Sequence, residues 1–207
     1  MPDLIRKTLE TKLTAEPGER AVVARISTSD VDRDGDVILP SGIDTTDFNK
    51  NPVVLMQHRA DMPPIGRAVQ IQTSSKHVKA KVIFPERPAM LGPLAGWPPD
   101  EALAYYQSGL LNAFSIGFVI EPDGARHAST KDIANHGDGC KRVITRWKLL
   151  EFSAVSVPAN QNALAMAVSK SQTWFKELWT AKEPRKLALL TPRRVQVVMP
   201  RRVGMVA

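Results

Sequence analysis

A serine, a histidine and a glutamate in this chain could act together on a carbonyl group. Ser115, His58 and Glu151 each fall in, or at the end of, a segment with strand-like alternation. In such a unit the imidazole takes the proton of the attacking hydroxyl, and the carboxylate fixes the imidazole tautomer. Geometry defines the unit, so the order His, Ser, Glu along the chain is acceptable. A protein of this size offers many such residues, so these three alone are weak evidence for a hydrolase.

The segment around Ser115 has one bulky face and one nearly bare face. Read as a strand, residues 111–120 place four large apolar side chains on one face: Phe114, Ile116, Phe118 and Ile120. Ser115 and Gly117 lie on the other face. A serine beside a glycine leaves room for another backbone, such as a peptide substrate, to approach the hydroxyl. The simpler alternative is a small serine that fills space in a packed sheet, and the pattern alone favours it.

His58 and Glu151 both occupy positions that need an explanation. His58 ends the expected strand 53–58, where a base can reach outward and where an idle surface histidine would also lie. Alternation places Glu151 on one face with Ser153 and Val155. A carboxylate in an apolar strand is costly unless it has a partner. An arginine contact would meet this need, and so would the orientation of a histidine.

Two other clusters suggest a metal ion but fit poorly. Carboxylates surround Gly35 at alternate positions: Asp30, Asp32, Asp34 and Asp36. An EF-hand needs a bidentate glutamate at the twelfth loop position, where this chain has Ser41, so we expect an acidic turn. Three potential zinc ligands match no common spacing: His127, His136 and Cys140. We therefore expect no metal ion at either cluster. We also expect no organic cofactor.

Alternation and turn signals predict the elements that must position the three residues. We expect strands at 20–28, 53–58, 65–71, 76–84, 111–120 and in the region 141–160. Pro99 and the two acidic residues after it suit the start of a helix that ends near Gln107. The Pro-rich stretch 85–99 and the stretch 121–140 are typical of surface loops.

The length and charge of the chain predict one domain with a basic tail. The 207 residues can bury one good-sized core. We expect a lead-in with little structure at 1–19, a domain at 20–168 and a tail at 169–207. Residues 170–207 contain nine Lys or Arg and two Asp or Glu, whereas the rest contains nineteen of each. The net charge of +7 therefore belongs to the tail, which we expect to be largely disordered with a helix near 172–182.

The composition is that of an ordinary soluble globular protein, with 43% hydrophobic and 24% charged residues. No apolar run approaches the roughly 18 residues that span a bilayer, and the N-terminus lacks the apolar region of a secretory signal. The single cysteine, Cys140, excludes an internal disulfide framework. We expect a protein that is made and used in a cytoplasm, with no membrane contact.

Five motifs, in the same order, resemble the prohead serine proteases of tailed bacteriophages. They are 32–36 (DRDGD), 51–58 (NPVVLMQH), 64–67 (PIGR), 114–118 (FSIGF) and 150–160 (LEFSAVSVPAN). The resemblance covers about residues 20–165, and the shared order argues against chance agreement.

This resemblance implies a role for each of the three residues. In the family, the histidine after the Asn-Pro strand is the general base and the serine of the Ser-Ile-Gly-Phe segment is the nucleophile, which implies these roles for His58 and Ser115. The acidic position before the Ser-x-Val-x-x-Pro-Ala-Asn segment, here Glu151, is the usual candidate for the third member. The family is also similar to the herpesvirus assembly proteases. That relation implies a mainly β (α+β) fold, a compact β-barrel of six to seven strands with a few surrounding helices.

The implied function is that of a serine endopeptidase of capsid maturation. It would cleave a scaffold protein or the scaffolding arm of the major capsid protein, and also itself, inside the immature capsid in the cytoplasm of the bacterial host. The alternative is a catalytically inactive capsid-assembly protein that binds scaffold with the same fold.

Other functions and assemblies have less support. Nucleic-acid binding depends on the basic tail alone, because the body has zero net charge and no aromatic stacking platform, so we do not expect it. A different serine hydrolase, such as an esterase, is disfavoured because no Gly-x-Ser-x-Gly elbow surrounds Ser115. Homo-oligomer formation, as in the similar herpesvirus enzymes, stays open.

Overall fold

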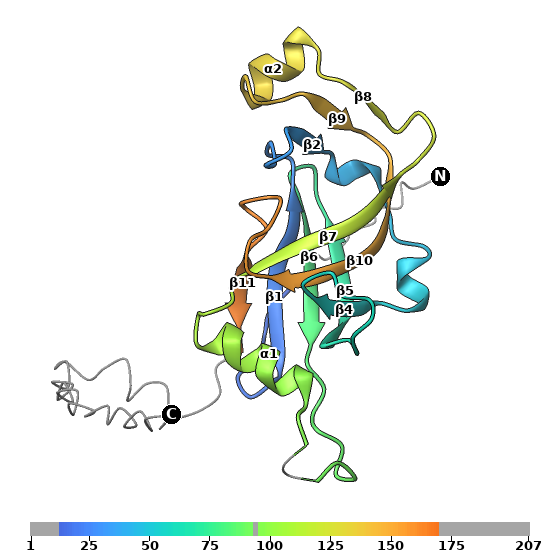
Figure 1. Ribbon diagram of the computed structural model, residues 1–207. Coiled ribbons are helices and arrows are strands. Elements are labelled where there is room, and N and C mark those ends of the chain that lie inside the picture. Colours follow the sequence, from blue (N-terminus) through green and yellow to red (C-terminus); the bar gives the residue numbers. More distant parts are fainter. Residues whose placement is uncertain (1–12, 93–94, 170–207) are drawn as a thin grey trace, which may run out of the picture.

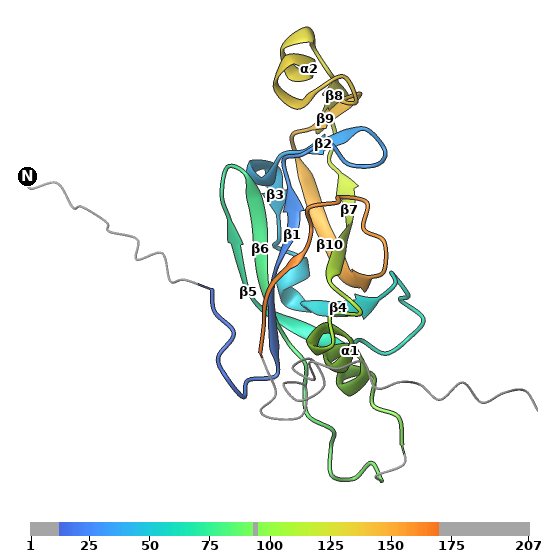
Figure 2. The same cartoon turned by 90° about the vertical axis from the view of Figure 1, so that its left-hand side faces the viewer.

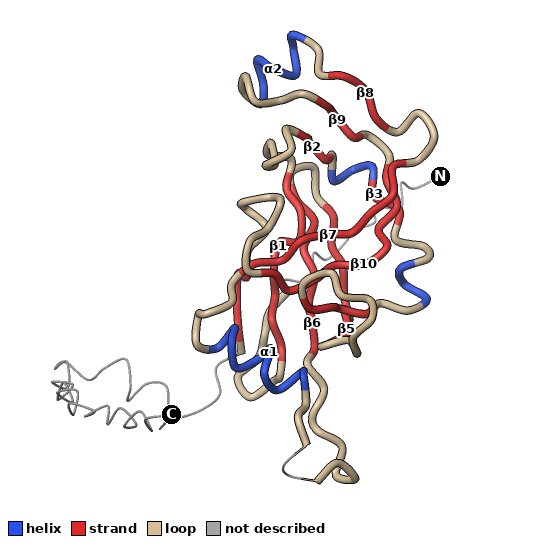
Figure 3. The backbone as a smooth tube through the Cα atoms, in the orientation of Figure 1, coloured by secondary structure: helices blue, strands red, loops and turns tan. Residues whose placement is uncertain are grey.

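The fold is known from a computed structural model of residues 1–207, in which the structure describes residues 13–92 and 95–169 (Figure 1). Strands dominate these described residues, with two α-helices, α1 (Pro98–Gln107) and α2 (Thr130–His136) (Figure 3). The expected mainly β fold is therefore confirmed. In this part of the chain no helix is both long and apolar enough to cross a membrane.

The larger of two sheets has eight strands. Its path runs through β11 (Ala165–Val168), β1 (Ala21–Thr28), β6 (His77–Ile83), β5 (Gly66–Thr73), β4 (Val53–Met56), β10 (Trp147–Val155) and β3 (Ile43–Asp44). β7 (Ala113–Ile120) pairs antiparallel with the edge of β10 that β4 leaves free. β10 therefore lies between the strand that leads to His58 and the strand that contains Ser115.

The expected closed barrel is not confirmed, because the strand pairing of the main sheet is open. β11 and β3 form the ends of its path. β7 approaches the β11 end through a single bridge between Ala113 and Leu164, and no longer ladder is formed there by the described strands. The sequence pattern predicts which residues face inward, but it does not specify whether the last pair of strands closes a ring.

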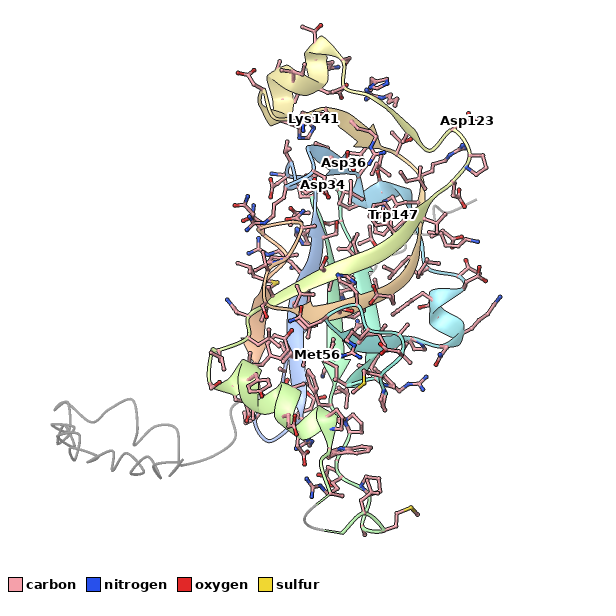
Figure 4. All side chains as sticks on the ribbon, viewed as in Figure 1. Asp34, Asp36, Met56, Asp123, Lys141 and Trp147 are labelled. Atoms are coloured by element: carbon pink, nitrogen blue, oxygen red, sulfur yellow. The ribbon has the colours of Figure 1, made fainter. Side chains whose placement is uncertain are left out.

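A second, smaller sheet stands at one end of the molecule, and α1 lies at the other end (Figures 1 and 2). It contains β2 (Asp36–Ile38), β9 (Arg142–Ile144) and β8 (Ala125–His127) in that order. The short helices η1 (Pro40–Gly42) and η2 (Phe48–Lys50) connect β2 to β4 through β3. Asp34, Asp36 and Lys141 gather at this end of the molecule (Figure 4), where the Arg142 guanidinium forms a two-pronged ion pair with Asp36.

The prediction of a surface loop over 121–140 was wrong, because this stretch contains β8 and α2. A capping box starts α2: the Ser129 hydroxyl accepts from the Asp132 N–H, and the Asp132 carboxylate accepts from the Ser129 N–H. This arrangement satisfies two of the free N–H groups at the start of a helix. The acidic stretch before β2 does form a turn, in which Asp32 Oδ1 accepts from the backbone N–H groups of Asp34 and Asp36.

The core lies under β7, β10 and α1. Phe114 and Phe152 are fully buried and meet edge to face, with ring centroids 5.8 Å apart. Ile116, Phe118 and Ile120 pack against the same core, which confirms the bulky face expected for this strand. Tyr106 of α1 stacks on Phe114 at 5.1 Å, and its hydroxyl donates to the carbonyl of Ala113 at 3.0 Å.

Several expected elements are confirmed within a few residues of their bounds, including β1, β4, β5, β6, α1 and β7. The division into lead-in, domain and tail stays a prediction. The tail beyond Ser169, its expected helix near 172–182 and residues 1–12 lie outside the described residues. Within the described part of the lead-in, Glu19 forms an ion pair with Lys81 at 2.7 Å.

We predict that Tyr106→Phe lowers the free energy of unfolding by about 1 kcal/mol, because it removes a buried hydrogen bond at the start of β7. Burial already raises the pKa of this hydroxyl well above its usual range. Urea denaturation measures the change. Tyr105→Phe is the matched control, because Tyr105 precedes it on α1 and is 42% exposed. Equal losses in both variants would contradict the role of the Tyr106 hydroxyl.

Candidate active site

A β-bulge in β10 turns Glu151 toward the candidate site. The register between β10 and β7 shifts between Leu149 and Glu151, so that Leu150 is an extra residue. Before the shift, Trp147 and Leu149 are buried in the core, and after it Phe152 takes that position. Without the extra residue, Glu151 would share the face of Leu149. Bulges commonly re-aim a side chain in this way.

Gly117 provides the space that the Glu151 carboxylate occupies. The two residues are opposite each other in the ladder between β7 and β10. A Cβ atom at Gly117 would lie 2.2 Å from Glu151 Oε1, far inside van der Waals contact. The sequence pattern predicts that the bare face beside Ser115 admits a substrate backbone. At Gly117 the structure fills that space with the carboxylate instead.

His58 lies on a turn in an unusual backbone conformation. Gln57 and His58 both have positive φ angles, 54° and 58°. Left-handed conformations of residues other than glycine cost free energy and persist where the surroundings hold them. Here the backbone N–H of Gln57 donates to the Ala154 carbonyl at 2.9 Å, and its side chain donates to the Ser156 hydroxyl at 2.9 Å. These two hydrogen bonds hold the turn after β4 against the end of β10. The turn follows Met56, the last residue of β4, which Figure 4 labels.

The imidazole of His58 forms a direct hydrogen bond with Glu151. Nδ1 of His58 lies 2.8 Å from Oε1 of Glu151. An ionised carboxylate only accepts hydrogen bonds, so Nδ1 is the nitrogen with the proton. In the neutral ring, Nε2 is then free to accept a proton. Glu151 is the more enclosed partner, with 18% of its side chain exposed against 42% for His58.

Ser153 joins the same group of residues. It is fully buried, its hydroxyl donates to Oε2 of Glu151 at 2.7 Å, and it accepts from the backbone N–H of His58 at 3.1 Å. Both carboxylate oxygens of Glu151 therefore have a donor. The sequence placed Ser153 on the face of Glu151 but did not indicate these contacts, because the turn that brings His58 back over β10 leaves no signal in the alternation.

Ser115 lies on the same face of the sheet, directly opposite Ser153 in the ladder. Opposite residues of antiparallel strands have their Cβ atoms about 5 Å apart. Gly117, opposite Glu151, is the next residue on this face of β7. The structure thus brings His58 and Glu151 into contact and places Ser115 beside them. Ser115 is 8% exposed.

No metal site accompanies this group in the part of the chain that the structure describes, and a cavity lies elsewhere. Within residues 13–92 and 95–169, no three His, Cys, Asp or Glu side chains form a cluster that could hold a metal ion. A cavity of about 580 Å³ lies elsewhere, between β3 and β5, with Ile43, Ala68 and Ile71 among its lining residues. A long polymer such as a polypeptide can be bound on an open face, so this separation is compatible with a site on β7 and β10.

Comparisons with known proteins agree with the expected resemblance. Residues 99–177 match the model of the caudovirus prohead serine protease family, a stretch that includes Ser115 and Glu151 but not His58. A capsid polyprotein of Pseudomonas phage PAJU2 is 29% identical over 163 residues, which are 78% of this chain and 22% of that protein. The chain thus spans about a fifth of the length of this relative. No solved structure matches.

The resemblance to the prohead proteases is therefore confirmed. The relation to the herpesvirus assembly proteases stays a prediction.

We predict that Gly117→Ala displaces the Glu151 carboxylate and breaks its bond to His58, because the new methyl group would overlap Oε1. Such overpacking costs about 1–3 kcal/mol of stability. The ¹⁵N chemical shifts of the imidazole report which ring nitrogen holds the proton, and the preference for Nδ1 should weaken. Gly92→Ala is the control, since nothing lies within 4 Å of its added Cβ. An unchanged imidazole spectrum in Gly117→Ala would contradict the steric account.

Proposed function

We propose that this chain is a serine endopeptidase that cleaves capsid or scaffold polypeptides during maturation of a phage prohead. The observation that supports this most directly is the hydrogen bond between His58 and Glu151 beside Ser115. The family match over residues 99–177 agrees with this function. The reaction would take place inside the immature capsid, in the cytoplasm of the bacterial host.

In this mechanism Ser115 is the nucleophile and His58 the general base. The Ser115 oxygen attacks the scissile carbonyl carbon while Nε2 of His58 takes the hydroxyl proton. Glu151 holds the ring through Nδ1 and stabilises the imidazolium. His58 then gives the proton to the leaving amine, and a water molecule hydrolyses the acyl-enzyme by the same steps. General base catalysis of this kind contributes roughly 10²- to 10⁴-fold in rate.

The free edge of β7 offers a place for an extended substrate. On the edge away from β10, β7 is bridged at Ala113 by Leu164, and the N–H of Phe114 donates to Ala163. Beyond this point, residues 116–120 have no strand partner on that edge among the described residues. Unpaired strand edges bind extended peptides through main-chain hydrogen bonds. A polypeptide aligned there would pass next to Ser115.

The relative from phage PAJU2 suggests which polypeptide this is. Its name is capsid polyprotein, and the part similar to this chain is about a fifth of its length. We infer that the substrate is a capsid polypeptide or its scaffolding segment, and that the enzyme also cleaves itself. The basic residues 170–207 are candidates for a self-cleaved or targeting segment.

One observation favours the alternative of an inactive assembly protein. Ser115 is only 8% exposed, so in this conformation little of its surface meets solvent. In that case the face around Ser115 would bind scaffold without cleaving it. The two functions differ in whether the Ser115 hydroxyl reacts.

We predict that a fluorophosphonate probe labels Ser115 of the full chain. The Ser115 oxygen would bond to phosphorus, fluoride would leave, and His58 would take the hydroxyl proton. Intact-mass spectrometry should show one adduct on the native chain and none on Ser115→Ala. The same spectra follow self-cleavage, which Ser115→Ala should abolish.

Ser75→Ala is the control for loss of an exposed hydroxyl, because Ser75 lies in the turn between β5 and β6 and not in the turn that holds His58. It should retain the adduct. A folded native chain that forms neither an adduct nor cleavage products would contradict the protease function and favour the binding protein.

A further inference from the structure

We propose that Ser153 is the positioning residue of this site, because its hydroxyl fixes both the carboxylate of Glu151 and the backbone of His58. This role extends the proposed protease function and depends on it. Ser153 would neither touch the substrate nor exchange protons with it. It would act through the other two residues.

The Ser153 hydroxyl acts both as a hydrogen-bond donor and as an acceptor. A hydroxyl has one proton to donate, and Ser153 donates it to Oε2 of Glu151 at 2.7 Å. One of its lone pairs accepts from the backbone N–H of His58 at 3.1 Å. Since its proton is already donated and its side chain is buried, Ser153 is not a second nucleophile.

Together these contacts form a closed ring of hydrogen bonds. It runs from the His58 N–H to Ser153 Oγ, on to Glu151 Oε2, and back from Glu151 Oε1 to Nδ1 of His58. Ser153 thus holds the backbone of His58, and Glu151 holds its side chain, while Ser153 and Glu151 are bonded to each other. Networks of this kind restrict the orientation of each member.

Removal of the Ser153 hydroxyl should loosen this ring without unfolding the turn. The His58 N–H would lose its acceptor, and Oε2 of Glu151 would lose its donor, beside a side chain that is itself fully buried. The turn has two other ties, from the backbone of Gln57 to Ala154 and from its side chain to Ser156. The loss should therefore appear first in the orientation of the imidazole.

The test compares Ser153→Ala with Ser75→Ala in the full chain. Ser75 is an exposed serine in the turn between β5 and β6, outside the ring and outside the ties of the His58 turn. With a fluorophosphonate as probe, Ser153→Ala should lower the rate of Ser115 phosphonylation at saturating probe by about 10- to 100-fold, because small misplacements of a reacting group have effects of this size. The probe concentration for half-maximal rate should stay the same. Ser75→Ala should react as the native chain does.

A second readout does not depend on reactivity. The ¹⁵N shifts of His58 should show a weaker preference for the proton on Nδ1 in Ser153→Ala, and Ser153→Thr, which retains a hydroxyl, should restore it. Circular dichroism confirms that each variant is folded. A Ser153→Ala protein with the native rate and the native tautomer would overturn the proposal.

The two arms separate this role from the protease function. If the native chain does not react with the probe, the protease function fails. The tautomer measurement then still decides whether Ser153 positions His58, because a shifted proton supports the role and an unchanged one overturns it. If the native chain reacts and Ser153→Ala reacts equally, the positioning role fails and the protease function stands.

Discussion

The site depends on one extra residue in β10. Trp147 and Leu149 must face the core, and so must Phe152 and Ala154, but a regular strand cannot satisfy both pairs because side chains alternate. The bulge at Leu150 resolves this conflict. As a result, Glu151 and Ser153 face away from the core, toward the turn that holds His58. The polar side of the site thus follows from the packing of its apolar side.

The same core gives the site a rigid base. Phe114 and Phe152 flank Ser115 and Ser153 in the two strands and are buried on the opposite face. Tyr106 stacks on Phe114, so that α1 fixes the start of β7. Well-packed aromatic side chains leave little freedom for the strands that bear them, so the core and the backbone ladder together hold β7 against β10. Hydrogen bonds then need to orient only the side chains.

Sequence patterns predicted the parts of this arrangement that depend on alternation. The two faces of β7 are of this kind, and so is the strand that precedes His58. That strand ends at Met56, however, and His58 lies in the turn after it and not at the strand end that alternation predicts. Two features leave no signal in the alternation. They are the bulge in β10, which puts the Glu151 carboxylate into the space at Gly117, and the turn that brings the His58 N–H to the Ser153 hydroxyl. The missed α2 did have a local signal, Ser129 followed by Asp132. Strand closure has none, and the expected barrel is not confirmed.

In the proposed mechanism the Ser115 hydroxyl oxygen and Nε2 of His58 form a catalytic pair. The most direct measurement is a crystal structure of the chain after reaction with a fluorophosphonate. We expect the phosphorus on the Ser115 oxygen, with Nε2 of His58 within about 3.2 Å of that oxygen and Nδ1 still bonded to Glu151. An adduct on another residue, or an imidazole turned away from Ser115 with its Glu151 bond lost, would contradict the account.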